Sequence, residues 1–126
     1  MMAQDRGRLG ERQAEAWLID HGLKLVERNY QCRAGEIDLV MLDPNPQDAE
    51  VLAFIEVRLR GPGAQVDGID SVDIHKQQRL IAAARHFLMT RPEWSEHACR
   101  LDVIGISGAA GQEQLRWIPG AFEVDD

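Results

Sequence analysis

Apolar side chains recur along the chain with the helical period in two segments. In residues 5–21 the buried face is expected to carry Gly10, Ala14, Trp17, Leu18 and His21, and Gly22 is the expected stop. A second helix is expected to begin at a cap formed by Asp70 or Ser71 and to run to about Thr90. Its apolar stripe comprises Leu80, Ala83, Ala84, Phe87 and Leu88.

Shorter apolar runs predict five strands, at 23–30, 35–42, 51–60, 99–106 and 113–118. The order α-β-β-β-α-β-β indicates an α/β fold, a mixed sheet flanked by helices, and we expect a single domain over 1–126. In the first strand we expect Leu23, Leu25 and Glu27 on one face, and Lys24, Val26 and Arg28 on the other. In the second strand we expect Ile37, Leu39 and Met41 on one face, and Glu36, Asp38, Val40 and Leu42 on the other.

Acidic residues gather on one face of the second and third strands. In the third strand Glu56, Arg58 and Arg60 continue the face of Leu52 and Phe54. A hairpin through 43–50 opposes residues whose numbers sum to about 93, which makes Glu56 the nearest same-face neighbour of Asp38. Two carboxylates at this range repel each other unless a cation, a basic side chain or a shared proton intervenes.

Each helix adds one charged residue to this cluster. Glu11 continues the apolar face of the first helix seven residues before Leu18, and Lys76 lies four residues before Leu80. If both faces pack on the sheet, Glu11 and Lys76 point towards Asp38 and Glu56. One or two carboxylates with water are typical ligands of Mg²⁺, so this pattern predicts a site for Mg²⁺ or Mn²⁺.

Ordinary structural roles account for the same residues one at a time. Glu56 and Arg58 also fit a solvated strand edge with a surface ion pair. Glu11 fits an exposed acid in the first turns of a helix, and Asp102 with Arg100 fits a structural pair. The convergence of residues from four elements is what favours the metal site.

Composition narrows the class of protein. The 126 residues include 44% apolar residues, enough for one core, and the net charge of −7 argues against a surface that is basic as a whole. The excess acid lies mainly in 41–56 and 101–126, so a local basic surface remains open. Without a long apolar run, a secretory leader or paired cysteines, we expect a cytoplasmic protein in which Cys32 and Cys99 are free thiols, although a disulfide stays open.

Several segments together resemble a known family. GRLGERQAEAWLIDHGLKLVERNYQCRAGEIDLV, FIEVRLR, HKQQRLIAAARHFL and CRLDVIGI, within about residues 7–122, are similar to the YraN-type family of small uncharacterised bacterial proteins. That family is assigned to the restriction-endonuclease-like superfamily, whose motif is Asp, a spacer, Asp or Glu, one residue and Lys. The resemblance implies that Asp38 and Glu56 are the two motif acids, that Glu11 is the helix acid, and that Glu36 belongs to the GEID segment.

One position departs from the motif, because Arg58 stands where the superfamily has Lys. An Arg side chain stays protonated and cannot act as a general base, but it can orient water or a phosphate. The departure leaves three outcomes open: an altered nuclease, a slow nuclease, or a domain without catalysis.

The leading hypothesis is a metal-dependent nuclease that hydrolyses phosphodiester bonds of structured or branched DNA, with DNA favoured over RNA. Glu11, Asp38, Glu56 and the Val57 carbonyl would hold Mg²⁺ or Mn²⁺. Phosphate contacts are expected from Arg6, Arg8, Arg12, Arg60, Lys76 and Arg79.

Two other hypotheses remain. The first is a catalytically inactive nuclease-like domain that binds nucleic acid or a protein. The second is a domain stabilised by ion pairs, with its binding surface near Trp94, Trp117 and Phe122. A homodimer is left open.

Overall fold

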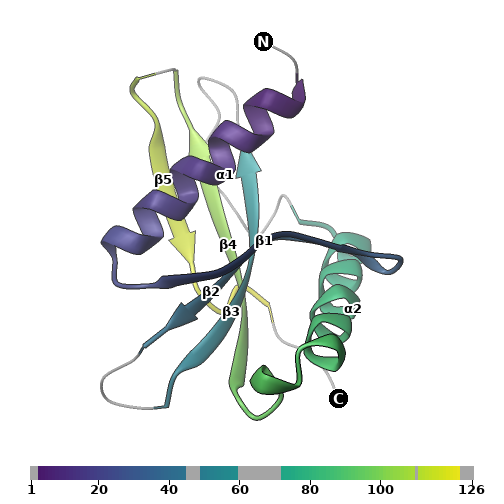
Figure 1. Cartoon of the computed structure of the whole chain (residues 1–126). Helices are drawn as coiled ribbons and strands as arrows, with labels where there is room; N and C mark the ends of the chain where they lie inside the picture. Colours follow the sequence, from purple (N-terminus) through teal and green to yellow (C-terminus); the bar gives the residue numbers. More distant parts are fainter. Residues whose placement is uncertain (1–2, 45–48, 60–71, 110, 123–126) are drawn as a thin grey trace.

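The chain folds in the predicted order. The computed structural model describes residues 3–44, 49–59, 72–109 and 111–122 (Figure 1). The elements are α1 (Ala3–Asp20), β1 (Lys24–Cys32), β2 (Gly35–Asp43), β3 (Val51–Leu59), α2 (Ile74–Thr90), the 3₁₀ turn η1 (Pro92–Trp94), β4 (Ala98–Ser107) and β5 (Gln114–Ile118). The α/β fold class is therefore confirmed, as a mixed sheet compatible with a nuclease-like fold.

The five strands form one sheet in chain order, β1-β2-β3-β4-β5. All neighbours are antiparallel except β3 and β4, which are parallel and are connected through α2. Leu39 pairs with Ile55, so the β2–β3 hairpin aligns residues one position away from the expected register.

Each helix covers its own face of the sheet (Figure 1). The face against α1 buries Ala14 and Leu18 among Leu39, Ile55 and Ile104. The opposite face is packed by α2, whose apolar stripe is buried as the spacing predicts, except that Leu88 is only partly buried. His21 was expected on the buried face of α1 and is instead exposed, where its ring stacks on Trp17.

Identifiable residues mark the start of α2 and the end of α1. Asp73 caps α2, because its carboxylate accepts a hydrogen bond from the Lys76 amide at 2.9 Å. The expected caps Asp70 and Ser71 lie outside the described residues. Gly22 ends α1 with a φ of 97°, and the Gly22 and Leu23 amides donate to carbonyls of the last turn.

The hairpin of β1 and β2 crosses the sheet, because side chains near its open end pack on the α1 side and those near its turn pack on the α2 side. The regular alternation of strand side chains did not predict this change of side. A bulge in β1 leaves Val26 unpaired, and Asn29 has a left-handed φ of 52°. Arg28 therefore reaches Glu15 of α1, while Tyr30 and Ile37 pack in the core against α2. The expected grouping of Ile37 with Leu39 is wrong, because Leu39 packs against α1.

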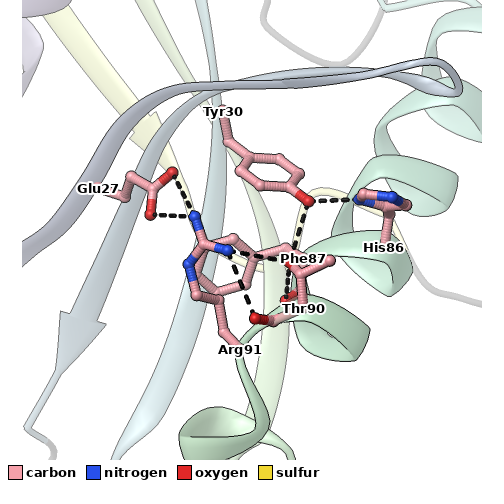
Figure 2. Close-up of polar contacts among 6 residues, drawn as sticks. All are labelled: Glu27, Tyr30, His86, Phe87, Thr90 and Arg91. Carbon is pink, nitrogen blue, oxygen red and sulfur yellow. Dashed lines mark hydrogen bonds and ion pairs between the residues drawn. The ribbon is translucent and has the colours of Figure 1, made fainter.

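A polar network connects the hairpin of β1 and β2 to α2 and to Arg91, the residue that follows α2 (Figure 2). Arg91 donates to both carboxylate oxygens of Glu27, at 3.1 and 3.2 Å, so Glu27 also lies on the α2 side, contrary to expectation. The Arg91 guanidinium lies over the Tyr30 ring, and the Tyr30 hydroxyl bonds to His86 and to Thr90. These contacts hold β1, and with it β2, at a fixed position against α2.

Asp102 has a structural role, as the ordinary interpretation proposed. Its side chain is fully buried and accepts hydrogen bonds from Arg100 at 2.8 and 3.0 Å, from the Trp117 indole at 3.0 Å and from the Gly120 amide at 2.9 Å. Four donors satisfy both carboxylate oxygens, so this buried charge is compensated.

The remaining aromatic and cysteine residues also have structural settings. Trp94 and Phe122 pack on the core beneath α2, and Trp117 packs on the core beneath α1, so all three serve packing. Cys32 and Cys99 are free thiols. Among the described residues, no helix is long and apolar enough to cross a membrane.

Candidate active site

The sheet divides at Asp38. Pairing between β2 and β3 ends at Leu39 and Ile55, although β2 starts at Gly35 and β3 continues to Leu59. Beyond this point β2 stays paired with β1, and β3 stays paired with β4. The Asp38 carboxylate accepts a hydrogen bond from the Val57 amide at 2.8 Å, so it replaces the next rung of the ladder.

Glu56 lies beside this division and is nearly buried, with 7% of its side chain exposed. Lys76 of α2 places its ammonium nitrogen 2.9 Å from a Glu56 carboxylate oxygen. Arg58 approaches the same oxygen at 3.8 Å. The predicted convergence of Glu56, Arg58 and Lys76 is therefore present, and β3 and α2 supply it together.

Burial and neighbouring negative charges raise the pKa of two acids in this region, Asp38 and Glu11. Burial raises the pKa of Asp38 to about 8, with further increases from the charges of Glu56, Glu11 and Glu36, and the Val57 amide opposes the shift. The pKa of Glu11 is also raised, chiefly by burial and then by Glu36 and Glu56. These acids from α1, β2 and β3 thus lie within one electrostatic neighbourhood.

Glu36 connects two hollows on the surface. One, of about 500 Å³, lies along α1 and β1, and its lining includes Glu11, Glu36, Arg8 and Arg12. The other, of about 110 Å³, is lined by Glu36, Glu56, Lys76, Arg79 and Leu80. The two hollows, called together the acidic groove here, share Glu36, and one reaches α1 while the other reaches the start of α2.

Basic residues border the acidic groove. Arg8 and Arg12 project from α1 and Arg79 from α2, and all three are exposed. Arg60 and the side chain of Arg6 lie outside the part of the chain that the structure describes. The three exposed arginines provide cations on both sides of the acids, which is the charge pattern expected for contact with phosphates.

The donor set suits a divalent cation bound by few protein ligands. Within the described ranges, no group of three or more His, Cys, Asp or Glu side chains is gathered closely enough to hold a metal ion. Mg²⁺ commonly uses one or two carboxylates and keeps several waters. Asp38 and Glu56 meet that smaller requirement, because Glu56 is buried, Asp38 is partly buried, and the charge of Glu56 helps to raise the pKa of Asp38.

Sequence reasoning missed two features of the acidic groove. Asn29 lines it and its side chain hydrogen-bonds Glu11, which lowers the pKa of that acid against the other influences. The Glu15–Arg28 pair lines the same hollow. The one available signal was Asn29 itself, since Asn adopts positive φ more readily than most residues.

An α/β sheet whose β2–β3 pairing ends beside Asp38 and Glu56, with hollows lined by acids and arginines, defines a small protein of nuclease-like fold with a candidate acidic site. The sequence model of "Uncharacterised protein family UPF0102" matches residues 10–106. The chain belongs to this family, and its resemblance to the YraN-type proteins is confirmed.

Three relatives, each named UPF0102 protein, match nearly their whole length. The protein from Stutzerimonas stutzeri is 45% identical over 121 residues, covering 96% of this chain and 97% of the relative. The protein from Nitrosococcus oceani is 44% identical over 122 residues, covering 97% and 94%. The protein from Alcanivorax borkumensis is 46% identical over 120 residues, covering 94% and 92%.

Proposed function

We propose that the protein is a metal-dependent nuclease that hydrolyses phosphodiester bonds of structured or branched DNA. The observation that carries the proposal is the carboxylate pair Asp38–Glu56 at the division of the sheet. A pKa of about 8 means that ionising Asp38 destabilises the folded protein unless a cation lies nearby to compensate the charge. A fold that keeps such a pair next to a groove with arginines at its border favours a cation and a phosphate as ligands.

The residues have distinct roles in this proposal. Asp38, Glu56 and the Val57 carbonyl would hold Mg²⁺ or Mn²⁺, and Glu11 of α1 would add a further carboxylate. Glu36 adds negative potential between the two hollows. A bound divalent cation lowers the pKa of water and offsets charge that develops on the phosphate.

The basic residues position the substrate. Arg58 orients the attacking water or the scissile phosphate, since its guanidinium cannot accept a proton. Arg8, Arg12 and Arg79, with Arg60 of the segment outside the described residues, contact phosphates along the strand. Such contacts give affinity without sequence specificity, which suits recognition of a branched shape.

Cleavage assays with matched variants test the proposal. The wild-type protein is expected to cut flapped or four-way DNA with Mn²⁺ and to lose activity in EDTA. Asp38→Asn keeps an oxygen for the Val57 amide but removes the charge, so activity is expected to fall at least about a hundredfold. Asp20→Asn, at the exposed end of α1, is the control and should behave as wild type. Full activity of wild type in EDTA would contradict the proposal.

A second candidate is a non-catalytic module that binds nucleic acid or a protein. The ion pair between Lys76 and Glu56 favours it, because an internal ammonium already compensates one acid. Calorimetric titration separates the two candidates. Binding of Mn²⁺ that Asp38→Asn abolishes supports the nuclease, whereas no binding at millimolar Mn²⁺ supports the module.

We also propose that the protein acts in the cytoplasm, with nucleic acid as its partner. Cell fractionation tests the location, and light scattering with and without branched DNA tests whether a homodimer forms.

A further inference from the structure

The backbone of Lys76 is held in place by contacts within the first turn of α2. Its amide is fixed by the Asp73 cap, and Gln77 donates to the Val72 carbonyl at 2.9 Å, so the first turn of α2 is anchored at two points. Lys76 also lies one turn before Leu80, which is buried against the sheet. The side chain is therefore directed towards Glu56 of β3, which it reaches at 2.9 Å.

We propose that Lys76 is the resident counterion of Glu56, and that a divalent cation must displace its ammonium group to bind. This inference rests on the proposed metal site and adds that Lys76 lowers the affinity of that site for the metal. A cation at Asp38 and Glu56 and an ammonium in contact with Glu56 repel each other. The affinity of the wild-type protein for the metal is therefore lower than Asp38 and Glu56 would give without the charge of Lys76.

The geometry assigns this role to Lys76 rather than to Arg58. Arg58 stands 3.8 Å from the Glu56 oxygen, beyond hydrogen-bond distance, whereas Lys76 is in contact. Lys76 also keeps 44% of its side chain exposed, so its flexible stem has room to swing into the acidic groove. A displaced ammonium in the small hollow would then lie beside Arg79, where a phosphate group is a suitable new partner.

Calorimetric titration with Mn²⁺ tests the proposal without any activity measurement. Lys76→Met removes the charge and keeps the length of the side chain, so we expect Mn²⁺ to bind roughly tenfold more tightly than to wild type. Lys76→Arg keeps the charge and should stay within about threefold of wild type. Lys24 is the only other lysine in the sequence, and Lys24→Met, at the start of β1, is the matched control.

The outcomes separate this inference from the proposed function. If wild type binds Mn²⁺ through Asp38 but Lys76→Met binds it no more tightly, the counterion role is wrong and the metal site stands. If neither protein binds Mn²⁺, the metal site itself fails and the inference fails with it.

A second measurement applies even if Lys76→Met does not fold. Reductive ¹³C-methylation labels the two lysines and the amino terminus of the wild-type protein. On addition of Mg²⁺ the Lys76 methyl resonance should move and narrow as its ion pair breaks, while the Lys24 resonance stays constant. A Lys76 resonance that keeps its width at saturating Mg²⁺ overturns the proposal.

Discussion

Asp38→Asn is expected to stabilise the fold, and to do so more strongly as the pH rises. The substitution removes a carboxylate that burial and Glu56 make costly to ionise. The amide oxygen of Asn can still accept the hydrogen bond from Val57, so the division of the sheet should keep its geometry.

The size of the effect follows from the pKa of Asp38, about 8 in the folded protein against the ordinary value of 3.8. The folded state binds this proton more tightly than the unfolded state, so wild-type stability falls as the pH rises from about 4 to about 8. At about 1.4 kcal/mol per pKa unit, the limit is on the order of 6 kcal/mol. Reorientation of Lys76 and entry of water reduce this, and we expect about 2 kcal/mol at pH 9.

Urea denaturation at pH 4, 6 and 9 measures the difference between the two proteins, because all other titrating groups are shared. The advantage of Asp38→Asn should be near zero at pH 4, should grow to pH 8 and should then stay constant. Asp20→Asn should show no such trend. An advantage that is independent of pH, or a variant less stable than wild type at pH 9, refutes the reasoning.

Two further predictions concern the scaffold. Asp102→Asn removes the carboxylate charge beside Arg100 and puts an amide N–H group among its N–H donors, although Arg100 keeps its ion pair with Asp43. Unfolding should become about 1–3 kcal/mol easier in urea, while Glu96→Gln on the surface should change little. A loss below about 1 kcal/mol would show that the buried ion pair does not stabilise β4. Gly22→Ala forces a side chain into the left-handed conformation at the end of α1 and should cost about 1 kcal/mol in thermal unfolding. Gly7→Ala, within α1 and with open space around its Cα, should instead stabilise slightly; similar effects at both glycines would contradict this explanation.

The sequence by itself determined the order of the elements and most of the buried faces. Leu52, Phe54 and Glu56 share the face towards α2 as their alternation predicts, and Leu80 and Phe87 lie in the helical stripe. Patterns of this kind are local, because the strand period of two and the helix period of 3.6 residues place neighbours without reference to the rest of the chain.

The tertiary structure alone decided how the first hairpin crosses the sheet and what surrounds the acids. The bulge at Val26 and the left-handed Asn29 change the side of the sheet towards which the following residues of β1 point. The hairpin therefore packs on both helices. The contact of Lys76 with Glu56 and the raised pKa of Asp38 depend on burial by segments distant in the sequence. Long-range packing sets the distance and the solvent exposure of charges, and no period along the chain encodes either one.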